Sequence, residues 1–204
     1  LHYLDHAEPA NARAAQSADI LSEHIYPQYN NTLKFLGHIT RITDFQKRHG
    51  AKKPIWFTEY GKYSSDHPNI GHAEFAHFLA NGNERTATAY NVKYLTILFS
   101  HGVDKVFFHQ RTWPLGLNLR SHRIHFDMLF DYGPTPHTFF VAANTMSWLL
   151  PPRTQPGVPV NETGPVFAYS FTRPQGKVLL VWTDDTPVLL TPDLHTLVNS
   201  VDVK

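Results

Sequence analysis

Residues 53–61 read Lys-Pro-Ile-Trp-Phe-Thr-Glu-Tyr-Gly, and they decide the fold that we predict for this chain. Residues 54–58 form a short apolar run that is typical of a buried strand. The run ends at the carboxylate of Glu59, and Gly61 begins a turn directly afterwards. A carboxylate at this position is badly placed for core packing. It is well placed for chemistry, because catalytic groups converge at the carboxyl ends of parallel strands.

Two further strand candidates flank this stretch, residues 18–24 before it and residues 103–108 after it. Helical patterns separate the three candidates. Strands that alternate with helices form parallel sheets joined by right-handed crossovers. The sequence therefore predicts an α/β region of about three strand–helix units over residues 1–150.

The helix between the first two strands is predicted from an apolar stripe that recurs every third residue. Asn31 or Thr32 can cap its start, and Gly50 can end it in a left-handed conformation. The members of the stripe are Leu33, Leu36, Ile39, Ile42 and Phe45.

Two more helices are expected further along the chain. One runs from about Asn83, its cap, to Ser100, and Gly102 stops it. The other opens with Pro136 at its first position, where the missing N–H costs nothing, and Trp148 is expected in its core-facing row. The inward residues of the earlier helix are predicted to be Ala87, Tyr90, Tyr94, Leu95 and Leu98.

The pattern changes after residue 150. From residue 164 onward apolar residues recur with period two, and residues 173–176, Arg-Pro-Gln-Gly, form a hairpin turn signal between two runs of this kind. Further strand candidates are residues 188–190 and 197–203. We therefore expect residues 151–204 to form a small antiparallel β-sandwich-like region, which stops as if in the middle of a strand.

The composition excludes several classes of protein. The chain has 204 residues, with Lys+Arg 18 against Asp+Glu 17, and this balance argues against a nucleic-acid partner. No apolar run approaches the roughly 18 residues that a membrane span needs. There are no cysteines, so disulfides and thiolate zinc sites are excluded, although the compartment stays open.

Each strand candidate ends in polar or aromatic groups, which parallel strands would bring to one edge of the sheet. These groups are His24 and Tyr26, then Glu59 and Tyr60, then His109 with Trp113 beyond it. Glycoside hydrolysis needs a carboxylate that attacks the anomeric carbon or activates water, and a second one that protonates the leaving oxygen. Tyrosine and histidine can hold such a carboxylate ionised and oriented, and a tryptophan offers its apolar face to a sugar ring.

These motifs resemble clan A glycoside hydrolases. Residues 54–61 look like the seventh-strand motif of that clan, residues 19–26 like the sixth strand, and residues 106–109 take the place of the eighth. The likeness is closest to the β-xylosidase and α-L-iduronidase branch, where a His-x-Tyr pair sits beside the nucleophile. The resemblance implies the C-terminal portion of a (β/α)8 barrel followed by a β-domain.

The resemblance also implies roles for individual residues. Glu59 would be the nucleophile of a retaining mechanism, and His24 and Tyr26 would tune it. The residues that would shape the sugar subsite are Trp56, Tyr60, His109 and Trp113. The expected partner is an oligosaccharide or glycoside substrate, without a cofactor.

One family feature is missing. The acid/base of the family is an Asn-Glu pair at the end of the fourth barrel strand, but Asn83-Glu84 and Asn161-Glu162 both follow Glu59 in the chain. The resemblance therefore implies that the acid/base lies outside this chain, in a missing barrel half or another chain. The isolated chain would then be poorly active.

Two other interpretations stay open. Glu59 could be a solvated salt-bridge partner, and the chain could be a non-catalytic carbohydrate-binding or interaction module. The histidine clusters suggest a metal site, but their spacing is poor for zinc, which favours His at i and i+4 on a helix. The residues concerned are His72, Glu74, His77, His122 and His125. The sugar, its linkage and exo or endo action are not determined.

Overall fold

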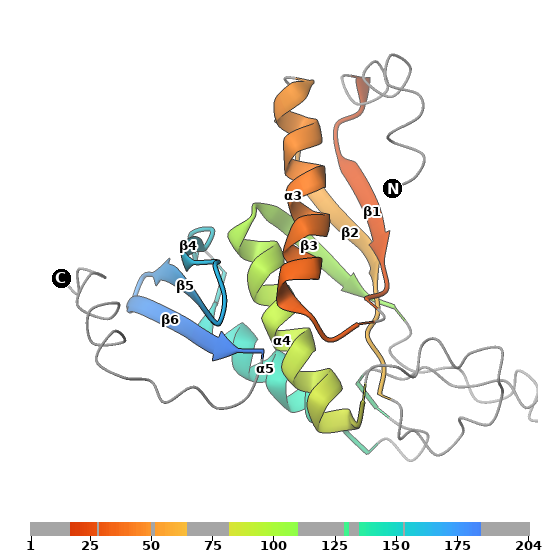
Figure 1. Cartoon of the computed structure of the whole chain (residues 1–204), viewed down its shortest axis with the longest axis vertical. Coiled ribbons are helices and arrows are strands. Elements are labelled where there is room, and N and C mark those ends of the chain that lie inside the picture. The colour runs from red at the N-terminus through yellow and green to blue at the C-terminus, as the bar shows by residue number, and fades with distance from the viewer. Residues whose placement is uncertain are drawn as a thin grey trace, which may run out of the picture.

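The computed structural model describes residues 17–27, 29–49, 52–64, 82–109, 129–130, 135–152 and 154–184. Its elements are β1 (Leu21–Ile25), α3 (Thr32–Arg48), β2 (Ile55–Tyr60), α4 (Glu84–Ser100), β3 (Val103–Phe108), α5 (Thr138–Leu149), β4 (Val158–Asn161), β5 (Val166–Arg173) and β6 (Gly176–Thr183) (Figure 1). Strands β1, β2 and β3 form a parallel sheet in that order, and β4, β5 and β6 form a separate sheet. The prediction of a mixed α/β chain with an antiparallel region near its end is confirmed.

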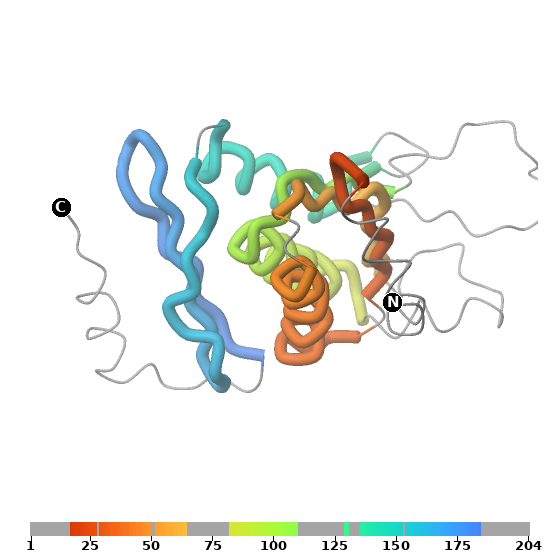
Figure 2. The backbone as a smooth tube through the Cα atoms, turned by 90° about the horizontal axis from the view of Figure 1, so that it is seen from above, coloured from red at the N-terminus to blue at the C-terminus, as the bar shows by residue number. Residues whose placement is uncertain are grey.

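The two sheets lie on opposite sides of α3 and α4 (Figure 2). Ile55 and Phe57 of β2 are buried in one cluster with side chains of both helices. Phe107 of β3 is 46% exposed on the other face of the parallel sheet. Parallel sheets are normally covered on both faces. Within the described residues, helices cover only one.

Helix α3 begins as predicted but faces the core differently. The side chain of Asn31 caps it by accepting a hydrogen bond from the Lys34 amide at 2.7 Å. Leu33 is 54% exposed, whereas Phe35 is fully buried, so the predicted stripe was wrong at its start. The reason is geometric: a strict three-residue spacing drifts around a helix of 3.6 residues per turn. The helix ends at Arg48, and Gly50 lies outside the described residues.

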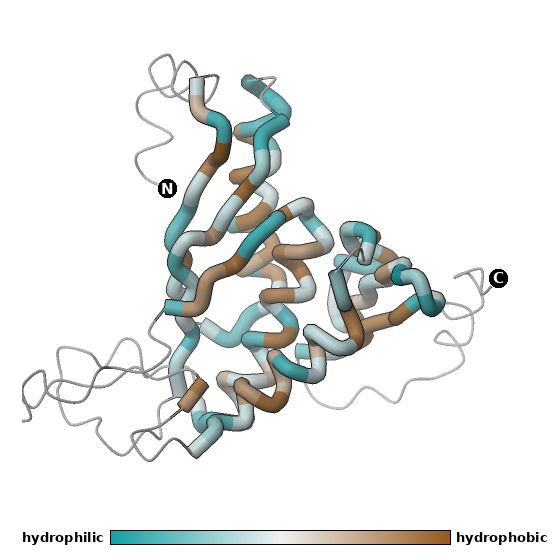
Figure 3. Tube along the Cα trace, turned by 180° about the vertical axis from the view of Figure 1, so that it is seen from behind, coloured by the Kyte–Doolittle hydropathy of each residue, from teal (hydrophilic) through white to brown (hydrophobic). Residues whose placement is uncertain are grey.

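Helix α4 confirms the prediction closely. Asn83 caps it through the Thr86 amide at 2.9 Å, and Gly102 follows it with a φ of 79°. Only glycine adopts that left-handed conformation without strain. All five predicted inward residues are buried. Hydrophobic and hydrophilic segments alternate along the helices in Figure 3, as expected for helices with a buried face.

Helix α5 corrects two predictions. It begins at Thr138 after the N-cap His137, and Pro136 instead forms an isolated bridge with Phe130. Trp148 is 73% exposed, so it is not a core residue. Its ring lies 5.9 Å from the Arg173 guanidinium, a cation–π distance at the surface.

The hairpin of β5 and β6 forms as predicted, and the Arg173–Gly176 pair closes it. Strand β4 was missed, because its four residues include Pro159 and show no alternation. Residues 188–190 and 197–203 lie outside the described residues. None of the described helices combines the length and hydrophobicity of a membrane-spanning segment.

The second sheet is joined to the start of α3 by a polar cluster around Asp184. The Asp184 carboxylate accepts hydrogen bonds from the Thr32 amide at 2.5 Å and the Thr32 hydroxyl at 2.7 Å. Lys93 of α4 lies 3.0 Å from the same carboxylate, and the Trp182 indole donates to the Thr32 hydroxyl at 3.2 Å. The carboxylate thus satisfies a helix amide that would otherwise lack a partner.

Candidate functional site

The three parallel strands end at the same edge of their sheet (Figure 1). His24 of β1 is the register partner of Glu59, and Tyr60 pairs with Phe108 of β3. The amide of His109 donates to the Tyr60 carbonyl at 2.9 Å. The expectation that β1, β2 and β3 are neighbours is therefore confirmed, and it brings the predicted strand-end residues together.

A β-bulge in β2 determines where Glu59 points. The pairing passes from Glu23–Phe57 directly to His24–Glu59, so β2 contains one extra residue at Thr58. Phe57 and Tyr60 are both fully buried, whereas the Glu59 side chain is 36% exposed. Without the bulge, strict alternation would turn Glu59 to the same face as Phe57. Bulges of this kind re-aim side chains beside active sites.

Three side chains converge on one oxygen of Glu59. The Tyr26 hydroxyl donates a hydrogen bond to Oε2. The Nδ1 atom of His24 lies 3.3 Å from Oε2, and the Nε2 atom of His109 lies 3.9 Å from it. Within the described part of the chain, Oε1 accepts no hydrogen bond. Among the described residues, the contacts of this carboxylate therefore fall on Oε2.

These neighbours keep Glu59 ionised. The hydrogen bond from Tyr26 is the largest cause that lowers the pKa of Glu59 below its ordinary 4.5. Burial, the second-largest cause, opposes it, and His109 and then His24 add to the lowering. Burial first, and then the Glu59 carboxylate, raise the pKa of Tyr26 well above its ordinary 10. At neutral pH Tyr26 is thus a fixed donor and Glu59 a fixed anion.

The loop after β2 adds Tyr63, which the sequence analysis missed because no pattern marks it. Its hydroxyl lies 3.2 Å from Nδ1 of His109, and the ring of His109 meets the edge of Tyr26 at 5.4 Å between centroids. A Cβ on Gly61 would lie 2.7 Å from Cζ of Tyr63 and 2.9 Å from Cδ1 of Tyr26. Only glycine leaves room for both rings.

The structure places two other predicted subsite residues, Tyr60 and Trp56, on opposite faces of the sheet. Tyr60 is fully buried and donates to Asn91 of α4 at 2.8 Å, so its prediction as a substrate contact is corrected to a structural role. Trp56 lies on the open face of the sheet, 6.0 Å from Phe107, with the Lys105 ammonium 4.0 Å above its ring. Trp113 lies outside the described residues.

The other Asn-Glu pairs have structural contacts. Glu84 accepts from the Thr138 amide at 2.5 Å, at the start of α5. Glu162 lies 2.6 Å from Nε2 of His101, at the end of α4. The described residues hold no group of three His, Asp or Glu side chains suited to a metal ion. The five residues that were considered as metal ligands, from His72 to His125, lie outside the described ranges.

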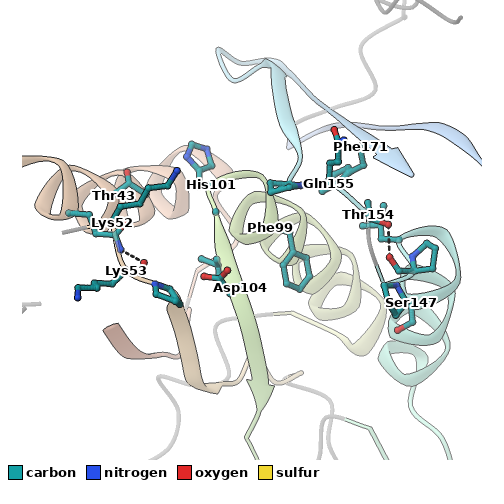
Figure 4. A pocket seen from close by; sticks show the side chains of 18 of the residues that line it. Thr43, Lys52, Lys53, Phe99, His101, Asp104, Ser147, Thr154, Gln155 and Phe171 are labelled. Atoms are coloured by element: carbon teal, nitrogen blue, oxygen red, sulfur yellow. Dashed lines mark hydrogen bonds between the residues drawn. The ribbon is translucent and has the colours of Figure 1, made fainter. Parts of the chain in front are cut away.

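A cavity of about 1260 Å³ lies at the opposite end of the parallel sheet (Figure 4). Lys53, Phe99, Asp104 and Phe171 are among its lining residues. Asp104 stands at the start of β3, where it accepts from the Ile55 amide at 2.9 Å. The cavity is therefore remote from Glu59 and does not form part of the strand-end site.

Neither the known protein-family models nor the curated proteins gave a match to this chain. The function is therefore inferred from the residues at the strand ends and from the contacts among them.

Proposed function

We propose that this chain belongs to a retaining glycoside hydrolase and that Glu59 is its nucleophile. The observation that carries the proposal is the Tyr26–Glu59 hydrogen bond at the carboxyl edge of a parallel sheet, with His24 and His109 beside it. An ionised carboxylate with one oxygen that accepts no hydrogen bond from the described residues suits attack on an anomeric carbon. The motif resemblance to clan A supports the same assignment.

The finer fold is also a proposal. A parallel sheet with helices on one face and an open opposite face is compatible with part of a (β/α)8 barrel, in which that face would line the interior. The bulge that aims Glu59 at the open face fits the same architecture. Residues 151–204 would then be the β-region appended to the barrel.

Each residue of the site would have a separate role in the reaction. Oε1 of Glu59 would attack the anomeric carbon, while Tyr26 holds Oε2. His24 and His109 add positive or hydrogen-bonding groups that favour the carboxylate. In the described part of the chain, none of the side chains that shift the pKa of Glu59 is a carboxylate. The acid/base, which retaining enzymes place about 5–5.5 Å from the nucleophile, must come from other residues.

The test uses a substrate that needs no acid. In 2,4-dinitrophenyl 2-deoxy-2-fluoroglycosides, the leaving phenolate departs without protonation. Glu59 forms an ester bond to C1 as the C1–oxygen bond to dinitrophenolate breaks, and the fluorine slows the later hydrolysis. We expect the 204-residue chain, incubated with a panel of xylosyl, glucosyl, galactosyl and arabinosyl reagents, to gain one glycosyl group on the peptide that contains Glu59.

Two variants control the labelling. Glu59→Gln should form no adduct, and Glu84→Gln, which changes a carboxylate at a helix end, should label like the wild type. The absence of an adduct across the panel, or labelling that survives in Glu59→Gln, would contradict the proposal. Ordinary aryl glycosides should be turned over little or not at all. Appreciable turnover that disappears in Glu59→Gln would show that the acid/base lies within the chain.

One observation favours a second candidate, a non-catalytic carbohydrate-binding or interaction module. Trp56 and Phe107 form a partly exposed aromatic pair on the open face of the sheet. Aromatic faces of this kind can stack on sugar rings. Oligosaccharide binding measured by calorimetry, unchanged in Glu59→Gln and unaccompanied by labelling, would favour this candidate over the hydrolase.

A further inference from the structure

Lys62 is buried, which is rare for a lysine. It follows β2 by two residues, and its side chain is 2% exposed. The sequence pattern would place it in a polar loop at the surface. Burial of an amine costs free energy unless hydrogen bonds compensate, so a lysine in this position needs a structural or functional reason.

The Lys62 amine is directed at the segment that carries Tyr26. Its Nζ donates to the Tyr29 carbonyl at 3.0 Å and approaches the Pro27 carbonyl at 3.4 Å. Pro27 is the residue directly after Tyr26. The Lys62 side chain therefore joins the segment after β1 to the segment after β2, close to the point where Tyr26 meets Glu59.

Both segments have a second anchor on α4. Asn91 donates to the Lys62 carbonyl at 3.0 Å while its own oxygen accepts from Tyr60. The Tyr94 hydroxyl donates to the same Tyr29 carbonyl at 2.7 Å. Asn91 thus fixes the backbone of Lys62. The Lys62 amine and the Tyr94 hydroxyl both donate to the Tyr29 carbonyl.

The surroundings of the amine are aromatic. Nζ lies 5.7 Å from the centroid of Tyr90 and 5.6 Å from that of Tyr94. Burial lowers the pKa of Lys62 to about 7. The buried amine makes its contacts with a backbone carbonyl and two aromatic rings, which argues for a role in geometry and against a role in surface electrostatics.

We propose that Lys62 is a positioning residue, which ties the Tyr26 segment to the end of β2 and thereby sets the Tyr26–Glu59 hydrogen bond. The catalytic importance of this bond rests on the proposed function. The bond itself can be measured without any reaction, through the protonation of Glu59. Among the described residues, the groups that face Glu59 are Tyr26, His24 and His109, and Lys62 acts on the first of them.

The experiment is an NMR titration of the Glu59 carboxyl carbon in the full chain. Lys62→Met keeps the apolar stem and removes the amine, so the Tyr26 segment loses its tie. We expect the pKa of Glu59 to rise in this variant, in the same direction as in Tyr26→Phe, which removes the hydrogen bond outright. A folded Lys62→Met chain whose Glu59 titrates as in the wild type would overturn the proposal.

Lys93→Met is the matched control. Lys93 is also a partly buried lysine of this region, donating to the Thr183 carbonyl at 3.0 Å and lying 4.2 Å from the ring of Tyr90. Its loss should lower stability but leave the pKa of Glu59 unchanged. An equal rise in both variants would mean that Lys62 acts only through general stability, and would also overturn the proposal.

Tyr94→Phe keeps the test decisive if Lys62→Met does not fold. It removes the other donor to the Tyr29 carbonyl, and the pKa of Glu59 should rise by less than in Tyr26→Phe. A rise as large as in Tyr26→Phe would show that Tyr94, and not Lys62, sets the hydrogen bond, and would overturn the proposal. Covalent labelling separates the two proposals: Lys62→Met should label on the order of 10- to 100-fold more slowly. If the wild type never labels but the pKa shift appears, the positioning role stands and the hydrolase proposal fails.

Discussion

Two carboxylates, Glu59 at the strand ends and Asp184 at the junction with the second sheet, show how the same group takes different roles. The Asp184 side chain is 17% exposed and is surrounded by an amide, a hydroxyl and the Lys93 ammonium. The Glu59 side chain is 36% exposed, and its contacts fall on one oxygen. Both oxygens of Asp184 accept hydrogen bonds, whereas the contacts that the described residues make with Glu59 fall on Oε2 alone.

The two carboxylates differ in role: Asp184 stabilises the fold, whereas Glu59 is the residue that we propose to be reactive. A carboxylate that accepts from fixed donors stabilises the fold, since removing it would leave those donors without partners. A carboxylate whose described contacts, a hydroxyl and two imidazoles, fall on one oxygen is the one that we propose as the nucleophile. Substitutions at Asp184 should therefore change unfolding, and substitutions at Glu59 should change reactivity.

The largest expected effect is on stability at the junction. Asp184→Ala should lower the free energy of unfolding by about 3 kcal/mol, because it leaves Lys93 and the first amide of α3 without their anion. Urea denaturation followed by circular dichroism measures the change.

Asp44→Ala is the matched control for this prediction. Asp44 pairs with Lys47 at 3.1 Å, but those side chains are 50% and 75% exposed. The control should cost no more than about 0.5 kcal/mol. Equal losses at the two sites would break the comparison, because burial would then not distinguish them.

A smaller effect is expected at two neighbouring tyrosines with different partners. Tyr60→Phe should cost about 1–2 kcal/mol, since the buried oxygen of Asn91 loses its donor. Tyr26→Phe should cost less than about 1 kcal/mol, because Glu59 is partly solvated. Of these two variants, Tyr26→Phe alone should raise the pKa of Glu59, as read by NMR titration. A rise of similar size in Tyr60→Phe would show that the site depends on strand packing more than on the hydroxyl.

The smallest expected effect is on how much the free energy of unfolding falls at acid pH. The pKa of Glu59 lies below its ordinary 4.5 in the folded chain, so the stability that it contributes is present above pH 4.5 and is lost as pH falls through the folded pKa. Glu59→Gln should therefore lose slightly less stability than the wild type between about pH 6 and about pH 3. Urea denaturation at the two pH values compares them. A larger loss of stability at acid pH in Glu59→Gln than in the wild type would contradict the prediction.

Much of the local structure could be predicted from the sequence because it depends on near neighbours. The caps Asn31 and Asn83 and the stop at Gly102 each act within one helical turn. The β5–β6 hairpin likewise follows from its turn residues. Leu33 and Trp148 were assigned to the core and are exposed, since the side of a helix that meets the core depends on its exact phase and on the neighbouring elements.

The sequence by itself determined the strand–helix alternation that makes the first sheet parallel, the β5–β6 hairpin, and the identity of the carboxylate at a strand end, because periodicity and turn chemistry are local properties. Only the tertiary structure decided the direction of Glu59, through a bulge that depends on pairing with β1. It also decided that Tyr60 is structural, that Lys62 is buried, and that Asp184 meets a helix 152 residues away in sequence. Such contacts join residues that are distant along the chain, and no local pattern encodes them.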